Sequence, residues 1–292
     1  MVEAEKKPKE LKKMSTISVL VPIHYKEKKE TIRSCLLSMV SQTVKPDEIV
    51  CVLDKPSTEE IETVIDEVAD KTGIRVVKCY CERGSGLGAV LNIGVKNCSC
   101  DYIARMDADD IAVPERLEKE RNYLDKNQDI DVVGSNIAEF ESSPDCIIAY
   151  RNVPADDLSC KVMLKRRDPI NHMSAMYRRE SVIKAGNYSK EMRSCEDTHL
   201  WTSFYATGLK FANIQENLVL VHAGREMYAR RGGKKSYEYV KKAIDYKYSV
   251  RLISRAESIL QKTANYCVLV LMSNNMRAFI YAKILRNKSN KE

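Results

Sequence analysis

The first 110 residues alternate between short apolar segments and amphipathic segments, and this alternation limits the fold more than any other feature. Apolar runs typical of buried parallel strands lie at Ile17–Ile23, Ile49–Leu53, Ile74–Val77 and Tyr102–Met106. Helical periodicity between them puts apolar side chains on one face, first at Ile32, Cys35, Leu36, Met39 and Val40. Four βα units in succession predict an α/β fold with a doubly wound, mostly parallel sheet flanked by helices.

Polar residues follow the predicted strands, and ligands of such sheets bind beyond the carboxyl ends of the strands. These residues are His24, Asp54, the glycine loop Gly84–Gly88 and Asp107–Asp110. Three carboxylates at positions 107, 109 and 110 raise each other's pKa, and a divalent cation is the usual relief. An Asp-x-Asp at a strand end can bind Mg²⁺ or Mn²⁺, which a substrate diphosphate completes. The alternative is that Asp110 caps the helix that follows Pro114.

The second half of the chain is less regular and ends in a helical segment. We predict a helix at 115–126, a strand at 132–134, an irregular insertion at 140–170 with one helix at 156–165, a strand-like run at 172–177, a helix that begins at Glu196 and a last strand at 218–221. The chain is divided into a disordered tail (1–13), the α/β domain (14–233) and a basic helical C-terminal extension (234–292).

The composition is that of a soluble globular protein, with 44% hydrophobic and 30% charged residues among 292. We find no N-terminal secretory signal and no apolar run near the roughly 20 residues of a membrane-spanning helix. The ten cysteines are therefore expected to be reduced thiols in the cytosol. The pairs Cys79-x-Cys81 and Cys98-x-Cys100 lack the usual zinc spacing.

The net charge of +7 is unevenly distributed. Residues 225–292 hold 16 Lys and Arg against 5 Asp and Glu (net +11), which leaves 32 against 36 (net −4) in residues 1–224. Basic residues such as Lys241, Lys247 and Arg251 alternate with tyrosines, a pattern that suits a helix lying on an anionic membrane surface. A helical hairpin that packs on the body, or a dimer contact, is the alternative. Nucleic-acid binding is not predicted, since the usual motifs are missing.

Seven motifs together resemble the family 2 glycosyltransferases over about residues 15–235. They are VPIHY…SMVSQT, VLD, GLGAVLN-x-G, YIARMDADDIAVPERLEKE, NHMSAMYRRESVIKAGNY, CEDTHLW and ARRGG. The likeness is strongest to bacterial enzymes that build capsular, O-antigen or exopolysaccharide units. It implies a GT-A fold, a nucleotide-sugar donor, Mn²⁺ or Mg²⁺ as cofactor, and inversion at the anomeric carbon.

For the donor, the resemblance places Pro22, His24 and the turn Tyr25–Glu27 around the base and ribose. Asp54 matches the family's second-strand Asp that accepts from the N3–H of the base, with a helix-capping role as the alternative. Arg230 and Arg231 form a basic loop suited to closing over a diphosphate with forked donors.

For the metal, Asp109 resembles the liganding Asp of the Asp-x-Asp motif, and Asp107 is expected on the ribose hydroxyls or at the ion. His222, at the end of the last strand, is a further metal candidate. For the catalytic base the resemblance points to Asp197, at the start of a helix whose dipole favours the ionised carboxylate. Glu196 is expected to orient the site or bind an acceptor hydroxyl. Capping of that helix is the alternative role for the pair, and His172 and His199 are the other candidate bases.

The predicted function is transfer of a hexose from a nucleotide sugar, UDP-linked by family habit, to a glycan or lipid-linked acceptor. Surface polysaccharide synthesis, in the cytoplasm or at the inner face of the cell membrane, is the expected setting. The alternatives are a sugar nucleotidyltransferase and a non-catalytic module that binds nucleotide sugars or anionic surfaces. The oligomeric state stays open.

Overall fold

The alternation at the start of the chain folds as predicted. The computed structural model describes residues 14–223, 232–273, 276, 287 and 288. Its first seven elements are β1 (Ile17–Ile23), α1 (Lys29–Val40), β2 (Glu48–Lys55), α2 (Glu59–Thr72), β3 (Arg75–Glu82), α3 (Leu87–Asn97) and β4 (Tyr102–Arg105). The predicted tail at 1–13 and the predicted diphosphate loop at Arg230 and Arg231 lie outside the described residues.

The second half contains more strand than the sequence predicts. Its elements are β5 (Ile111–Ala112), α4 (Arg116–Lys126), β6 (Val132–Phe140), β7 (Ile147–Arg151), α5 (Asp157–Leu164), the 3₁₀ turn η1 (His172–Ser174), β8 (Met176–Arg178), α6 (Arg179–Lys184), α7 (Glu196–Ala206), β9 (Phe211–His222), α9 (Lys234–Ser249), α10 (Arg255–Tyr266), the π-helical turn η2 (Cys267–Leu271) and β10 (Asn287–Lys288). The predicted irregular insertion therefore contains β7 as well as α5. The predicted strands at 132–134 and 218–221 are parts of the longer β6 and β9.

One mixed sheet runs through the molecule in the order β10-β7-β6-β8-β4-β1-β2-β3. The half formed by β4, β1, β2 and β3 is parallel throughout. The other half is antiparallel where β8 joins β4 to β6 and where β7 joins β6, while β9 runs parallel to β6. Since β1, β2 and β4 are parallel, the residues that follow them share one edge of the sheet.

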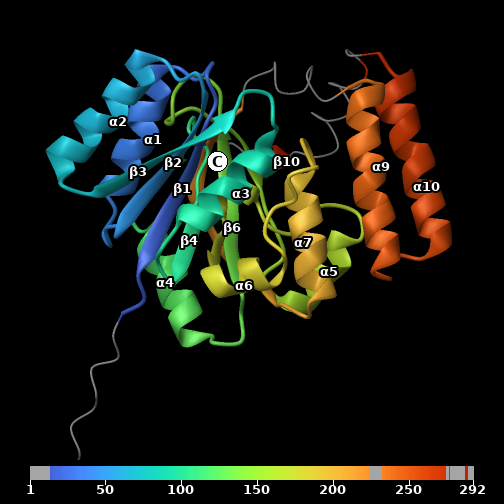
Figure 1. The fold of residues 1–292 in the computed structure, drawn as a ribbon. Helices are drawn as coiled ribbons and strands as arrows, with labels where there is room; N and C mark the ends of the chain where they lie inside the picture. The colour runs from blue at the N-terminus through green and yellow to red at the C-terminus, as the bar shows by residue number, and fades with distance from the viewer. Residues whose placement is uncertain (1–13, 224–231, 274–275, 277–286, 289–292) are drawn as a thin grey trace, which may run out of the picture.

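Helices cover both faces of the sheet (Figure 1). Apolar side chains of α1, α2 and α4 pack on one face, and those of α3, α5 and α7 pack on the other. Trp201 of α7 is fully buried, with the rings of Phe204 and Phe211 against it, and belongs to the core. Arg116 at the start of α4 donates to the carbonyl of Arg105 over 2.7 Å and so holds the end of β4.

The C-terminal segment forms a helical hairpin, α9 and α10, that lies beyond α7 in Figure 1. The ring of Tyr246 stacks on His199 with centroids 4.4 Å apart, and its hydroxyl lies 3.1 Å from that of Ser203. The structure therefore has the hairpin on the body that the sequence left as one alternative. Within the described ranges, no helix is both long and apolar enough to cross a bilayer. All ten cysteines are free thiols.

Candidate active site

A cavity of about 710 Å³ opens at the carboxyl ends of β1, β2 and β4. The prediction that strand-end residues meet at this edge holds for six of the candidates, which line the cavity together: Pro22, His24, Glu27, Asp54, Asp107 and Asp109. Gly84 and Gly86 of the glycine loop line it as well, beside Leu87 at the start of α3. The sequence placed these residues far apart, and the parallel strands bring them to one rim.

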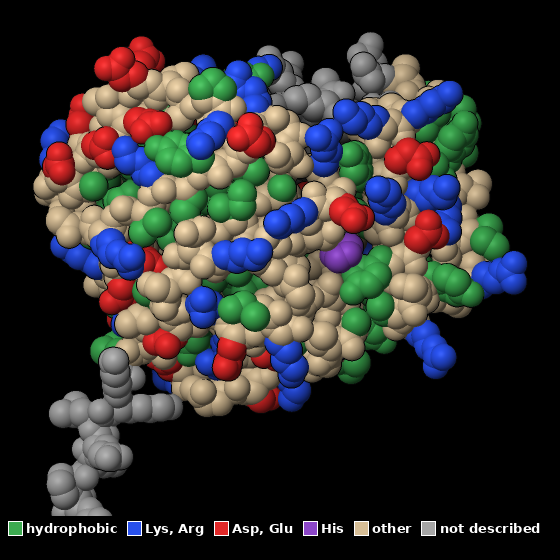
Figure 2. Space-filling model, viewed as in Figure 1, with side chains coloured by type: hydrophobic (Ala, Val, Ile, Leu, Met, Phe, Trp, Pro, Cys, Tyr) green, Lys and Arg blue, Asp and Glu red, His purple; other side chains and the backbone are tan. Residues whose placement is uncertain are grey.

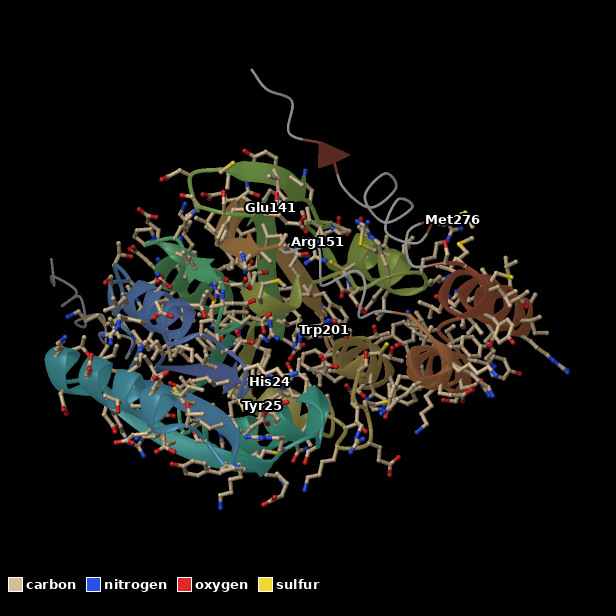
Figure 3. All side chains as sticks on the ribbon, turned by 90° about the horizontal axis from the view of Figure 1, so that it is seen from above. His24, Tyr25, Glu141, Arg151, Trp201 and Met276 are labelled. Atoms are coloured by element: carbon tan, nitrogen blue, oxygen red, sulfur yellow. The ribbon has the colours of Figure 1, made fainter. Side chains whose placement is uncertain are left out.

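His24 and Asp54 line one part of this first cavity, and Tyr25 lies beside them. The rings of His24 and Tyr25 lie 4.5 Å apart at the end of β1 (Figure 3). The Asp54 carboxylate is 8% exposed, accepts from the backbone N–H of Tyr25 over 3.3 Å and lies 3.7 Å from Nε2 of His24. The cap of α2 is Thr58, so the capping alternative for Asp54 is excluded. Asp54 is thus a buried acceptor at the wall of the cavity, as recognition of a base N–H requires.

Gly86 and Gly88 allow the loop at residues 189–194 to pack closely over the start of α3. A Cβ at Gly86 would lie 2.6 Å from the Cα of Arg193, and one at Gly88 would lie 2.4 Å from the carbonyl oxygens of Ser189 and Met192. Because both positions lack a Cβ, the loop packs closely and puts Arg193 and Ser194 on the cavity wall. The sequence analysis missed Arg193, since no strand-end or spacing signal marks it.

The opposite wall of the first cavity comes from the C-terminal hairpin. Lys235, Ser236 and Tyr239, all in the first turns of α9, line the cavity beside Gly232. Lys235 and Arg193 supply the positive charge of the described lining, apart from His24 if protonated. The sequence analysis assigned α9 to a separate basic extension, so Lys235 was also missed.

Asp107 is held by an arginine of its own strand end. Arg105, 2% exposed, makes a two-pronged ion pair with it: Nη1 donates to Oδ2 over 2.7 Å, and Nη2 lies 2.6 Å from Oδ1. Such a pair fixes both the charge and the orientation of the carboxylate. The charge of Asp107 is therefore already balanced by Arg105 where Asp107 faces the two cavities. A carboxylate paired in this way suits hydrogen bonding to sugar or ribose hydroxyls better than binding a cation by itself.

Asp109, Asp110 and His222 meet where β9 ends. Asp110 accepts from the backbone N–H of His222 over 2.9 Å, while Glu115 occupies the cap position of α4. Asp110 thus ties β9 to the acidic turn, and the expectation that it caps the next helix is wrong. Burial, followed by the charges of Asp107 and Asp109, raises the pKa of Asp110 well above its ordinary value. Burial and Asp107 also raise the pKa of Asp109.

This turn fits a divalent cation with two protein ligands. Nδ1 of His222 lies 4.0 Å from Oδ2 of Asp109, close enough for one ion to contact both. Nε2 of His222 lies 3.1 Å from the carbonyl oxygen of Glu141. A carbonyl only accepts, so the neutral ring carries its proton on Nε2 and keeps the Nδ1 lone pair for a metal. The excess negative charge of the turn favours a cation in the same way.

The donor set is small. No group of three or more His, Cys, Asp or Glu side chains among the described residues is arranged to hold a metal ion. Mg²⁺ and Mn²⁺ bound with nucleotides take few protein ligands, because phosphate oxygens and water complete the shell. Asp109 and His222 are therefore the residues that would hold the ion.

A second cavity, of about 330 Å³, meets the first at Leu87 and Asp107, which line both. Its walls carry both predicted catalytic residues, Glu196 and Asp197, together with Asp168 and His172. Arg151 of β7 and Arg167, which follows α5, line it as well, and Arg151 lies well away from His24 in Figure 3. Asp168 and the two arginines were not predicted, because no sequence signal marks them.

The two carboxylates at the start of α7 differ in environment. Glu196 is 6% exposed, and burial, followed by the charge of Asp197, raises its pKa to about 8. Asp197 is half-buried, and its Oδ1 accepts from the backbone N–H of Thr198 over 2.7 Å. The residue before the helix, Cys195, makes no side-chain cap. Asp197 thus satisfies one N–H of the first turn and still faces the cavity, so capping and function use the same carboxylate.

The alternative bases are less well placed. His172 is buried and bonded through Nε2 to the hydroxyl of Tyr188 at 2.8 Å. Burial and the charge of Arg105 hold its pKa well below the ordinary value. His199 stacks on Tyr246 of α9 and does not line either cavity. His172 is thus a neutral wall residue, and Asp197 is the carboxylate best placed to take a proton.

A sheet that is parallel in its first half and mixed in its second, flanked by helices and with a cavity at the ends of its parallel strands, is the GT-A fold of glycosyltransferases. The chain belongs to glycosyl transferase family 2, whose model matches residues 18–186. Enzymes of this family commonly use a divalent metal. The assignment confirms the predicted enzyme class and speaks against a sugar nucleotidyltransferase.

Relatives and solved structures agree with this family. The amylovoran biosynthesis glycosyltransferase AmsE of Erwinia amylovora is 30% identical, covering 91% of this chain and 98% of its own. The UDP-Gal:alpha-D-GlcNAc-diphosphoundecaprenol beta-1,3-galactosyltransferase of Escherichia coli is 31% identical, covering 92% of this chain and 96% of its own. TarS 1–349 of S. aureus, solved with UDP-GlcNAc, has a TM-score of 0.64 at 17% identity, covering 91% of this chain and 79% of its own. That likeness confirms the fold.

Proposed function

We propose that this protein transfers a hexose from a UDP-sugar to a hydroxyl of a glycan or lipid-linked acceptor, with inversion at the anomeric carbon. The observation that carries the proposal is the junction of the two cavities at Leu87 and Asp107. A donor in the first cavity would present its sugar at this junction. An acceptor in the second cavity would approach the same point from the side of Asp197.

The chemistry is a single displacement. Asp197 takes the proton of the acceptor hydroxyl, the hydroxyl oxygen forms a bond to the anomeric carbon, and the bond from that carbon to the diphosphate oxygen breaks. With the base in one cavity and the diphosphate in the other, attack and departure would occur on opposite sides of the carbon, which would invert it. Glu196, protonated near neutral pH, can donate to an acceptor oxygen without competing for the proton.

The leaving diphosphate needs positive charge. Arg193 and Lys235 line the first cavity from two different segments and can contact phosphate oxygens. A divalent cation at Asp109 and His222, when bound, would supply Lewis-acid neutralisation of the same charge. Asp54 and the ring of His24 would hold the base, by accepting from its N3–H and by stacking.

The biological role proposed is synthesis of a surface polysaccharide. It is supported by the names of two relatives, one for amylovoran biosynthesis and one for transfer from UDP-Gal to a GlcNAc-diphosphoundecaprenol acceptor. Both relatives match along more than nine tenths of this chain, so the likeness includes the second cavity and the start of the hairpin.

A donor screen tests the proposal. UDP-, GDP- and dTDP-sugars are incubated with the protein with and without Mn²⁺, and release of nucleotide is measured. We expect release from a UDP-sugar at least about tenfold above a blank without enzyme, dependent on the metal. Release of diphosphate from UTP plus sugar phosphate, in place of nucleotide release, would instead indicate a nucleotidyltransferase. Binding of UDP without any turnover would indicate a non-catalytic module.

We also propose that α10 contacts an anionic membrane surface. Its outer face exposes Ile259 and Leu260, at 57% and 69%, beside the exposed Arg255. Figure 2 shows hydrophobic and basic side chains together on this edge of the molecule. Apolar side chains next to basic ones are the pattern of interfacial helices. A lipid-linked acceptor would require such a position.

Vesicle binding is the test of this surface. We expect the protein to sediment with vesicles that contain an anionic phospholipid and much less with neutral vesicles. Replacing Ile259 and Leu260 together with serine should weaken binding by about tenfold or more, since two apolar side chains no longer leave water. The matched control is the pair Thr263→Ser and Ala264→Ser on the same helix. Equal binding to neutral and anionic vesicles would contradict the proposal.

A further inference from the structure

Lys247, a basic residue of the C-terminal hairpin, has a buried side chain. It is 4% exposed, on the face of α9 that also carries the buried Ala243 and Ile244. Its ammonium donates to the carbonyl oxygen of Leu164, at the end of α5, over 2.7 Å. A buried ammonium is costly unless negative charge lies nearby. Lys247 is one of the residues whose pattern suits a helix on an anionic surface, and its burial excludes that role for its side chain.

The negative charge comes from the wall of the second cavity. Asp168, four residues after Leu164, lines that cavity with Asp197. Its Oδ2 accepts from the hydroxyl of Thr198 over 3.0 Å, and its Oδ1 has no hydrogen-bond partner among the described residues. The backbone N–H of Thr198 donates to Asp197. Thr198 therefore joins the two carboxylates, and the ammonium of Lys247 is held at the end of α5, four residues before Asp168.

We propose that Lys247 is a positioning residue for the transfer reaction: its buried ammonium, held at the end of α5, stabilises the negative charge of the Asp168–Asp197 pair, so that Asp197 can accept the acceptor proton. The inference rests on the proposed function of that cavity. It makes α9 part of both halves of the site, since Lys235 in its first turn lines the donor side. The hairpin is then required for catalysis and not only for attachment to a surface.

The electrostatics of the surroundings agree with this role. Burial, followed by the charge of Asp197, raises the pKa of Asp168 to about 7, and Lys247, Thr198 and Arg151 oppose the rise. Burial lowers the pKa of Lys247, and Asp168, Asp197 and Cys195 oppose that change.

Two arginines that line the same cavity, Arg151 and Arg167, remain in place when Lys247 is replaced. The thiol of Cys195 stays neutral, because burial raises its pKa to about 12. Burial, followed by the charge of Asp197, raises the pKa of Glu196 to about 8, so this residue holds a proton near neutral pH. The charge of Arg151, on β7, acts on Asp168 in the same direction as that of Lys247. Without Lys247, one proton would remain on the carboxylate pair to a higher pH.

The test is the pH dependence of nucleotide release from the UDP-sugar. In Lys247→Met we expect the acid limb of kcat to move up by about one pH unit, as expected for the loss of a unit charge in buried surroundings. The rate at high pH should approach that of the wild type, because the carboxylate pair is then ionised in both. Lys247→Arg keeps the charge and should restore the profile. Lys241→Met, on the exposed face of α9, is the control with the same change in net charge.

Thermal unfolding against pH gives a readout that does not need turnover. A buried carboxylate whose pKa is raised in the fold costs stability as the pH rises from its unfolded value through its folded value. The fall in Tm between pH 6 and 8 should be larger in Lys247→Met than in Lys241→Met. A larger fall with an unchanged rate profile would overturn the role in transfer. No difference in either measurement would overturn the coupling itself. If the wild type releases no nucleotide, the proposed function is wrong, and so is the role of Lys247 in transfer. The dependence of Tm on pH then shows by itself whether Lys247 interacts with the carboxylate pair.

Discussion

Asp197→Ala is expected to abolish sugar transfer while leaving nucleotide and Mn²⁺ binding intact. The carboxylate lines the second cavity and is absent from the lining of the first, where the donor would bind. Removing a general base costs about 10²–10⁴ in rate. We therefore expect kcat to fall by that factor, with the dissociation constant for UDP changed less than about threefold. Transfer assays and calorimetric titration with UDP and Mn²⁺ measure the two quantities.

The controls for this variant separate chemistry from folding. Asp197→Asn keeps the shape and the acceptor for the Thr198 N–H but not the base, so it should be as inactive as alanine. Glu191→Ala removes an exposed carboxylate from the preceding loop and should transfer normally. Wild-type turnover by Asp197→Asn would show that another group takes the proton, and Glu196 would be the next carboxylate to replace.

The fold was predictable where local pattern and tertiary structure agree. The runs at Ile17–Ile23 and Ile49–Leu53 contain apolar residues on both faces, which only a strand between two helical layers requires, and both became central strands. β7 was missed because Ile147–Arg151 is half-buried on most of its length and has no uniform apolar face. The predicted strand was shorter than β9 because the middle of β9, Gln215 to Asn217, is polar and exposed, and its register with β6 shifts there.

The site was predictable where strand ends supply it. Asp54, Asp107 and Asp109 were found because parallel strands place their successors on one edge. Arg193 and Asp168 lie in loops whose course depends on packing, as when Gly86 and Gly88 admit the loop that carries Arg193. Sequence spacing carries no record of such contacts. Arg105, the partner of Asp107, lies only two residues away in the sequence. That it pairs with both carboxylate oxygens is seen only in the side-chain geometry.

The charge of the C-terminal segment illustrates the same limit. The segment has a positive net charge, but its lysines lie in three different environments. Lys235 faces the first cavity, Lys247 is buried at the end of α5, and Lys241 is exposed. A basic balance predicts an anionic partner for the segment as a whole. It does not tell which cation meets a phosphate of the donor, a carboxylate of the same chain or a lipid surface.

Asp109→Ala is expected to lose metal-dependent transfer while the folded protein becomes no less stable. Asp109 is the acidic side chain nearest Nδ1 of His222, and Asp107 is already paired with Arg105. Without Asp109 the ion loses the carboxylate that lies beside Nδ1 of His222, so Mn²⁺ affinity in the presence of UDP should fall by about tenfold or more, and kcat by about 10² or more. Titration of Mn²⁺ by its paramagnetic signal, with and without UDP, reports the loss without turnover.

Stability separates this result from damage to the fold. Burial and Asp107 raise the pKa of Asp109, so its ionised form costs stability at neutral pH when no cation is bound. Removing that charge should leave Tm at pH 7 unchanged or higher in metal-free buffer, and Mn²⁺ with UDP should then raise Tm less than in the wild type. Asp145→Ala, an exposed carboxylate of the β6–β7 loop, should behave as the wild type in both respects. If Asp109→Ala bound Mn²⁺ as tightly as the wild type, the ion would have to be bound by Asp107 instead. The pair of Asp107 with Arg105 would then have to open.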